Sequence, residues 1–189
     1  MARAFTALLL GTALISVTSG VTKKSCEEFG RGVSFTSTQA IGTWHLVRLE
    51  QSKDPGDAQC VQFSTVGEQE RKDLASRIGK VVDVQWEKLA LKMQIPCPSG
   101  QNNKTRDYYL ECLDVPGSYR TLQMPMPSAK LETADFGRHP MRLKMVLDKY
   151  LAMMDCYHNF VFVMGKQPHI ERVEPELKKL LEDNAANDY

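Results

Sequence analysis

The sequence has little net charge, and its few long apolar runs are confined to its first residues. With 24 Lys and Arg against 23 Asp and Glu, the formal net charge is +1. This balance predicts no nucleic-acid partner and no attraction to an anionic membrane. The 189 residues are enough to bury one sizeable core, and no linker or internal repeat divides them.

Motifs for catalysis and metal binding are also missing. The sequence contains no H-x-x-x-H, H-E-x-x-H or G-x-S-x-G motif and no C-x-x-C pair. The four histidines are predicted to be surface or turn residues, and His45 is expected to point away from Trp44 along a strand; they are His45, His139, His158 and His169. We therefore predict no enzyme, no metal site and no cofactor.

The first twenty residues look like a signal peptide. Arg3 supplies the positive start, residues 5–15 are apolar, and Thr18 and Gly20 are small residues placed for cleavage. The apolar run is too short to span a bilayer, and no later stretch approaches the required length. Residues 21–189 are thus expected to form one secreted, extracellular domain without a transmembrane segment.

Secretion makes the five cysteines interpretable, because disulfides form and persist outside the cell. An odd number predicts two bridges and one free or intermolecular thiol; the cysteines are Cys26, Cys60, Cys97, Cys112 and Cys156. Asn103 begins the sequon Asn-Lys-Thr in a polar run and is a predicted glycosylation site.

Short β-prone runs separated by turn residues cover most of the chain. After an N-terminal arm over 21–40, the predicted strands are 43–50, 59–66, 79–86, 89–95, 105–113, 118–124, 142–147, 150–156 and 160–164. Residues 125–141 have no clear assignment. Apolar residues on one helical face predict a helix over 171–184. This order favours an antiparallel sandwich or barrel with one late helix outside the sheet.

Three segments carry a resemblance to a known family. The first is IGTWHLVRL, with Gly42 and Trp44 at the start of a strand. The second is MVLDKYLAMMDC, in which Asp148 and Tyr150 stand at a shortened turn that lacks the usual Thr-Asp-Tyr. The third is FVMGKQP, where Lys166 stands in place of the usual Arg. Together with the late helix, these segments resemble the lipocalins, as an outlying member near apolipoprotein D and the insect bilin-binding proteins.

The resemblance implies a fold and a set of structural residues. It implies an eight-stranded antiparallel up-and-down barrel with the C-terminal helix packed outside. Trp44 is expected to close the narrow end with Lys166 laid over its ring, although Lys lacks the planar fork of Arg. The same resemblance implies a Cys26–Cys156 bridge. Cys60 then pairs with Cys97 or Cys112, or one of these three stays free. We favour a Cys97–Cys112 bridge with Cys60 as the free thiol.

A barrel of this size leaves room for one small ligand, and apolar walls would bury an apolar guest. The predicted function is therefore to bind and transport a small hydrophobic ligand such as a fatty acid, retinoid, sterol or bilin-like pigment. The wall candidates are Leu46, Arg48, Leu151, Met153, Phe162 and Met164. Ordinary core packing explains the apolar candidates almost as well. Arg48, if it points inward, would favour a ligand with a carboxylate.

Two other functional readings remain open. Some lipocalins act through loops, as protease inhibitors or as ligands of a cell-surface receptor, and the odd cysteine and the glycosylated loop are compatible with such a role. A secreted β-sandwich outside the lipocalins would have no cavity at all. A monomer or weak dimer is expected in each case.

Overall fold

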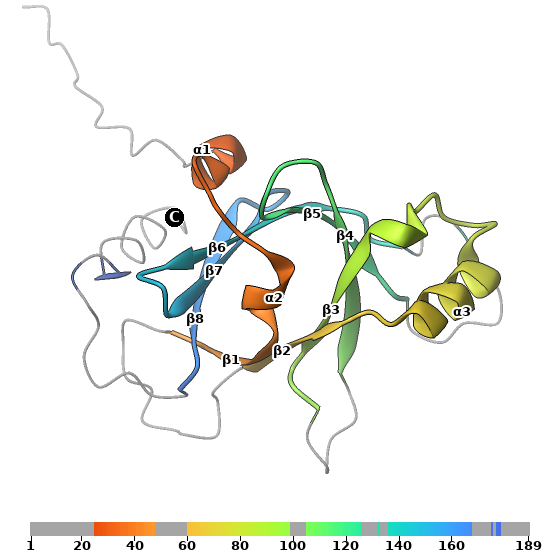
Figure 1. Ribbon diagram of the computed structural model, residues 1–189, viewed down its shortest axis with the longest axis horizontal. Helices are drawn as coiled ribbons and strands as arrows, with labels where there is room; N and C mark the ends of the chain where they lie inside the picture. The colour runs from red at the N-terminus through yellow and green to blue at the C-terminus, as the bar shows by residue number, and fades with distance from the viewer. Residues whose placement is uncertain are drawn as a thin grey trace, which may run out of the picture.

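The computed structural model describes residues 25–47, 60–98, 105–125, 132, 136–167, 175, 177 and 178. Eight strands close into one barrel, and each strand pairs antiparallel with the next (Figure 1). The strands are β1 (Gly42–Leu46), β2 (Cys60–Thr65), β3 (Leu89–Ile95), β4 (Arg106–Cys112), β5 (Ser118–Gln123), β6 (Pro140–Val146), β7 (Tyr150–Asp155) and β8 (Phe160–Gly165). The predicted antiparallel up-and-down barrel is confirmed in this respect.

The alternating strand directions define two ends of the barrel. We call the end where the odd-numbered strands begin the base, and the end where they finish the rim. Before β1, the helices α1 (Cys26–Gly30) and α2 (Ser37–Ala40) lead the chain to the base. The helix α3 (Glu68–Ile78) and the short helix η2 (Trp86–Lys88) connect β2 to β3, also at the base.

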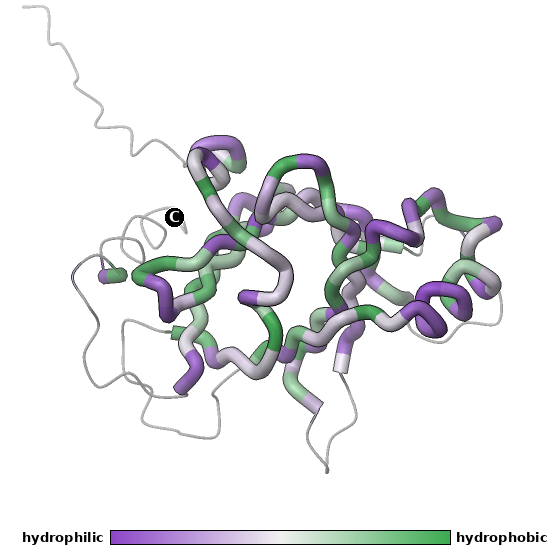
Figure 2. Tube along the Cα trace, in the orientation of Figure 1, coloured by the Kyte–Doolittle hydropathy of each residue, from purple (hydrophilic) through white to green (hydrophobic). Residues whose placement is uncertain are grey.

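The buried residues form three clusters, one inside the barrel and two on its outer surface. The interior cluster holds Trp44, Phe63 and Leu151 among its members. The second lies between the barrel and the α3 segment and includes Leu74 and Ile78. The third lies beside α1, where Phe29 packs against outward residues of β7 and β8. Apolar residues run nearly without interruption along β7 and β8, whose outer faces are covered by the third cluster, whereas β6 alternates more clearly between apolar and polar residues (Figure 2).

The connection between β2 and β3 is where the predicted secondary structure is wrong. Residues 68–78 are helical, and the strand predicted over 79–86 is instead a turn and loop followed by η2. Val82 and Val84 are buried in the second cluster, against Leu89 and Leu122 on the outside of the barrel. The alternation of apolar and polar residues over 79–86 therefore comes from a loop that covers the sheet. Such a loop can show the same apolar pattern as a strand.

A polar network also holds α3 to the barrel. Tyr109 Oη donates to Glu70 Oε1 over 2.8 Å, and Lys92 Nζ lies 3.4 Å from the same oxygen. Lys92 also lies 2.9 Å from Asp107 Oδ2. Burial, assisted by the hydrogen bond to Glu70, raises the pKa of Tyr109 to about 12. The phenol therefore stays protonated at neutral pH and remains the donor in this network.

The disulfides agree with one expected pairing and overturn the other. Cys26 is bonded to Cys156, the bridge that the resemblance implied. Cys60 is bonded to Cys97, and Cys112 is the free cysteine of the described residues. The favoured Cys97–Cys112 bridge and the free Cys60 are therefore wrong. Cys60 and Cys97 meet because β2 begins and β3 ends at the rim, whereas Cys112 is the last residue of β4, at the base.

The remaining segments are described in part. The segment without assignment, 125–141, contains the start of β6 and a bridge between Gly137 and Gln123. Residues 175, 177 and 178 of the predicted C-terminal helix are helical, and Leu177 is buried in the third cluster. The rest of that helix, the signal peptide and Asn103 lie outside the described residues. Of the helices in the described part of the chain, none is long and apolar enough to cross a membrane.

The cysteine pairing is open to a direct test by peptide mapping without reduction. We expect linked peptides joining Cys26 to Cys156 and Cys60 to Cys97, and an alkylated Cys112 once the chain is unfolded. A linked peptide that contains Cys97 and Cys112 would show that the assignment is wrong.

Candidate functional site

The interior of the barrel is built from the inward residues of all eight strands. Cross-strand partners share a face, so the register extends the interior face from one strand to the next. Most buried members of this cluster are aliphatic or aromatic, and its methionines are Met93, Met141, Met153 and Met164. Methionine adapts its shape readily, which suits a wall that has to fit a guest.

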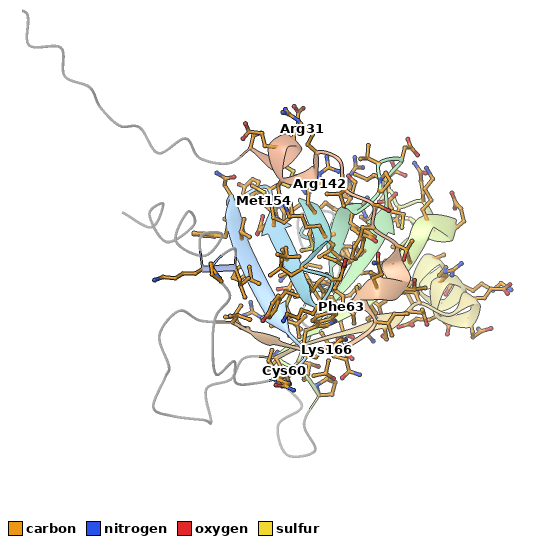
Figure 3. All side chains as sticks on the ribbon, turned by 60° about the vertical axis from the view of Figure 1, so that its left-hand side comes forward. Arg31, Cys60, Phe63, Arg142, Met154 and Lys166 are labelled. Atoms are coloured by element: carbon orange, nitrogen blue, oxygen red, sulfur yellow. A yellow bond between two sulfur atoms is a disulfide. The ribbon has the colours of Figure 1, made fainter. Side chains whose placement is uncertain are left out.

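The base is closed by the segment that precedes β1. Phe35 and Ala40 are buried in the interior cluster, and the indole N–H of Trp44 donates to the carbonyl oxygen of Ala40. Lys166 Nζ lies 3.6 Å from the centroid of the Trp44 ring and donates to Ile41 O over 3.1 Å. Burial lowers the pKa of Lys166. Figure 3 shows Lys166 just past the end of β8, well away from Met154 of β7.

Gly42 has a structural role at this closed end. Its φ of +112° lies in the region that L side chains rarely adopt, and a Cβ there would lie 3.1 Å from Lys166 Nζ. The glycine of the G-x-W segment thus lets the chain turn into β1 while the lysine crosses over Trp44.

The rim, by contrast, exposes apolar side chains on the interior face. Phe162 is paired with Met153 and Phe160 with Asp155, so both phenylalanines continue the face of the interior cluster. Their exposed fractions are 36% and 48%, whereas Met164 on the same strand is fully buried. The apolar interior therefore meets solvent at the rim.

Four rings gather at this part of the rim. His139 lies 4.6 Å from Tyr157 between ring centroids, Tyr157 lies 4.8 Å from His158, and His158 stacks on Phe160 at 6.5 Å. Tyr157 is 67% exposed, which makes it the most exposed large apolar side chain of the described residues.

Asp155 fixes the turn that carries two of these rings. Its Oδ1 accepts from the backbone N–H groups of Tyr157 and His158 over 2.9 and 3.1 Å, and its Oδ2 lies 2.8 Å from His158 Nδ1. Burial alone would raise the pKa of Asp155, but the hydrogen bonds from His158 and from both backbone groups outweigh it. The pKa therefore lies below its ordinary 3.8.

The wall candidates are distributed over the barrel as follows. Leu151, Met153 and Met164 are buried in the interior cluster, and Leu46 packs against it. Phe162 faces inward but lies partly exposed at the rim. Arg48 lies outside the described residues.

The signature residues at the turn between β6 and β7 lie outside the interior. Asp148 is exposed with a φ of 55°, and Tyr150 is buried in the third cluster, on the outer face. His45 is paired with Cys60, on the opposite face from Trp44. Across the described part of the chain, no group of three or more His, Cys, Asp or Glu could hold a metal ion.

No family model, no curated protein and no solved structure matches this chain. Its function therefore has to follow from its own geometry: an apolar interior, a closed base and a rim where that interior meets solvent.

The contact between Lys166 and Trp44 predicts a measurable contribution to stability. Lys166→Met removes the cation and the hydrogen bond to Ile41, and we expect a loss of about 0.5–1 kcal/mol in the free energy of unfolding, measured by chemical denaturation. Lys166→Arg keeps the charge and is expected to retain or increase the stability. Equal losses in both variants would exclude the cation–π contact as the cause.

The Asp155 turn predicts a stability that depends on pH. A folded-state pKa below the unfolded value gives stabilisation that is complete above the unfolded pKa, about 4, and is lost as the pH falls through the folded pKa. Asp155→Asn should lower the free energy of unfolding at pH 7 by about 0.5–1.5 kcal/mol and flatten its acid dependence.

The matched control for this prediction is Asp148→Asn at the exposed turn between β6 and β7, where Asn also tolerates the positive φ. The stabilities of the two variants are compared by thermal melts between about pH 2.5 and 7, a range that spans the titration of carboxylates. If the Asp148 variant changed the acid dependence as strongly as the Asp155 variant, the assigned role of Asp155 would be wrong.

Proposed function

We propose that this protein is a secreted, non-catalytic binding protein of lipocalin type that carries a small hydrophobic ligand inside its barrel. The observation that carries the proposal is the difference between the two ends. The base is closed by Phe35, Ala40 and Trp44, whereas Phe160 and Phe162 bring the apolar interior face to solvent at the rim. An apolar guest entering at the rim would bury these rings.

The chemistry of the interior supports an apolar guest over a polar one. The buried inward residues of β1, β2, β3, β7 and β8 are apolar, and they come from strands that surround the same axis. Burying apolar surface contributes roughly 25 cal/mol per Å², so a guest the size of a fatty acid or retinoid gains most of its affinity from such walls. The lipocalin-like order of the strands supports the same proposal.

Two disulfides are compatible with an extracellular protein. Transport between cells through an aqueous phase is the setting in which an apolar ligand needs a carrier. We therefore place the proposed function outside the cell.

Native mass spectrometry with organic extraction of the secreted protein tests the proposal. A co-purifying lipid or pigment, or a mass increase on adding fatty acid, retinol or biliverdin, is the expected result. A mass that none of these compounds changes would refute carriage and favour the loop-mediated role, for which the exposed Tyr157 would be the first residue to test.

A variant at the rim predicts where the ligand lies. Phe162→Ser should weaken binding of the neutral apolar dye N-phenylnaphthylamine by about 1 kcal/mol, roughly fivefold, because it removes an apolar contact at the entrance. Leu113→Ser is the control, since Leu113 is similarly exposed, at 37% against 36%, but follows β4 at the base. Fluorescence titration measures both affinities, and an equal loss in the two variants would exclude the rim as the entrance.

A further inference from the structure

Three polar side chains lie on the interior face near the rim, one on β4, one on β5 and one just before β6. Arg106 is paired with Ile95, and Gln123 is paired with Tyr108; both partners pack against the interior cluster. His139 precedes buried Met141 by two residues and therefore shares its inward face. We call Arg106, Gln123 and His139 the rim arc.

Gln123 lies within reach of each of the other two members of the rim arc. Gln123 is opposite Tyr108 and Gly137, so Arg106 and His139 occupy diagonal positions on either side of it. Diagonal neighbours on one face of a sheet are roughly 7–8 Å apart, which long side chains span. Gln123 can therefore share a ligand group with Arg106 on one side or with His139 on the other.

The side chains of Gln123 and His139 converge on Gly137. A Cβ on Gly137 would lie 3.0 Å from Gln123 Oε1 and 3.4 Å from His139 Nε2. A Cβ at these distances would be crowded, so both polar atoms lie directly against the glycine. A small polar atom of a ligand placed beside this glycine would be within reach of both side chains.

The rim arc has hydrogen-bonding capacity that the described residues do not use. Among them, the side chains of Arg106 and Gln123 and the ring nitrogens of His139 have no hydrogen-bond partner, although the His139 ring packs on Tyr157. A guanidinium, a carboxamide and an imidazole can each donate an N–H. Asp155, the inward carboxylate at the end of β7, is already engaged with His158 and two backbone N–H groups.

We propose that the rim arc binds the carboxylate head of a single-chain amphiphile whose apolar tail lies in the barrel. This inference rests on the proposed function. A carboxylate accepts several N–H donors at once, and such charge-assisted hydrogen bonds are about twice as strong as neutral ones. The donors lie on β4, β5 and the approach to β6, while the aromatic residues Phe160 and Phe162 of β8 line another part of the rim. The ligand class is therefore a long-chain carboxylic acid.

The test compares dodecanoic acid with dodecan-1-ol, which has the same tail and a neutral head. Binding to the disulfide-bonded protein, freed of lipid by organic extraction, is measured by isothermal titration calorimetry. We expect the acid to bind about tenfold more tightly than the alcohol, the ratio that one or two hydrogen bonds to a charged group provide.

Variants of the rim arc then assign the preference to its residues. Gln123→Leu and His139→Phe remove donors while keeping apolar bulk, and Gly137→Ala crowds both side chains from the backbone. Each should lower the affinity for the acid several-fold and leave that for the alcohol unchanged. Arg106→Met is expected to do the same, whereas its control Arg120→Met, an exposed arginine on the outer face of β5, should change neither.

The outcomes separate this inference from the proposed function. Equal binding of acid and alcohol by the unmodified protein would overturn the role of the rim arc while carriage stands. Variants that weaken both ligands alike would overturn it too, because they would show a general effect on the barrel. If neither ligand bound, and the compounds of the mass-spectrometry test also failed, both the carriage and the inference would be refuted.

Discussion

The pairing of β1 with β8 is the constraint on which the rest of this structure depends. It joins His45 to Gly165 and Leu46 to Met164, and it continues with the Val47 N–H donating to Val163 O over 2.8 Å. This seam closes the sheet, and only a closed sheet has an inside. Every assignment of a side chain to the interior or to the outer surface follows from that closure.

Contacts on both sides of the sheet reinforce the short seam. On the inner side, Trp44 of β1 is buried in the interior cluster, and the exposed Lys166 just after β8 lies over its ring at the base. On the outside, Val47 and Val163 are buried together with Phe29 and Leu177 in the third cluster. The Cys26–Cys156 bridge ties α1 to the turn that follows β7, so the covering helix cannot separate from the strands that it packs on. Arg31 and Arg142 also lie beside α1 (Figure 3).

The sequence predicts most of the barrel because strand alternation is a local property. A side chain such as Trp44 or Leu151 points inward or outward according to its position along its own strand, and turn residues mark where the strands end. The helix α3 was not predicted because its apolar pattern is weak: it buries little beyond Leu74 and Ile78. Val82 and Val84 led to the prediction of a strand because a loop that covers a sheet can bury every second residue, as a strand does.

The cysteine pairing and the rim arc could not be predicted from local pattern, because both depend on register between strands. Cys60 reaches Cys97 only when β2 and β3 lie side by side in the observed alignment. Likewise Gln123 and His139 meet beside Gly137, and both His139 and Gly137 belong to the segment 125–141, which showed no clear pattern in the sequence. A histidine before a proline looks like an ordinary loop residue until the sheet places it on the interior face.

The central claim is that a ligand occupies the inside of the barrel, and methionine methyl groups report on this most directly. In protein labelled with carbon-13 at the methionine methyl groups, titration with dodecanoic acid should shift or broaden the NMR signals of Met93, Met153 and Met164 in the interior. The signal of Met154, which is buried on the outer face beside α1, should stay in place. A ligand that moved Met154 and left the interior methyl groups unchanged would contradict the account, because it would be bound outside the barrel.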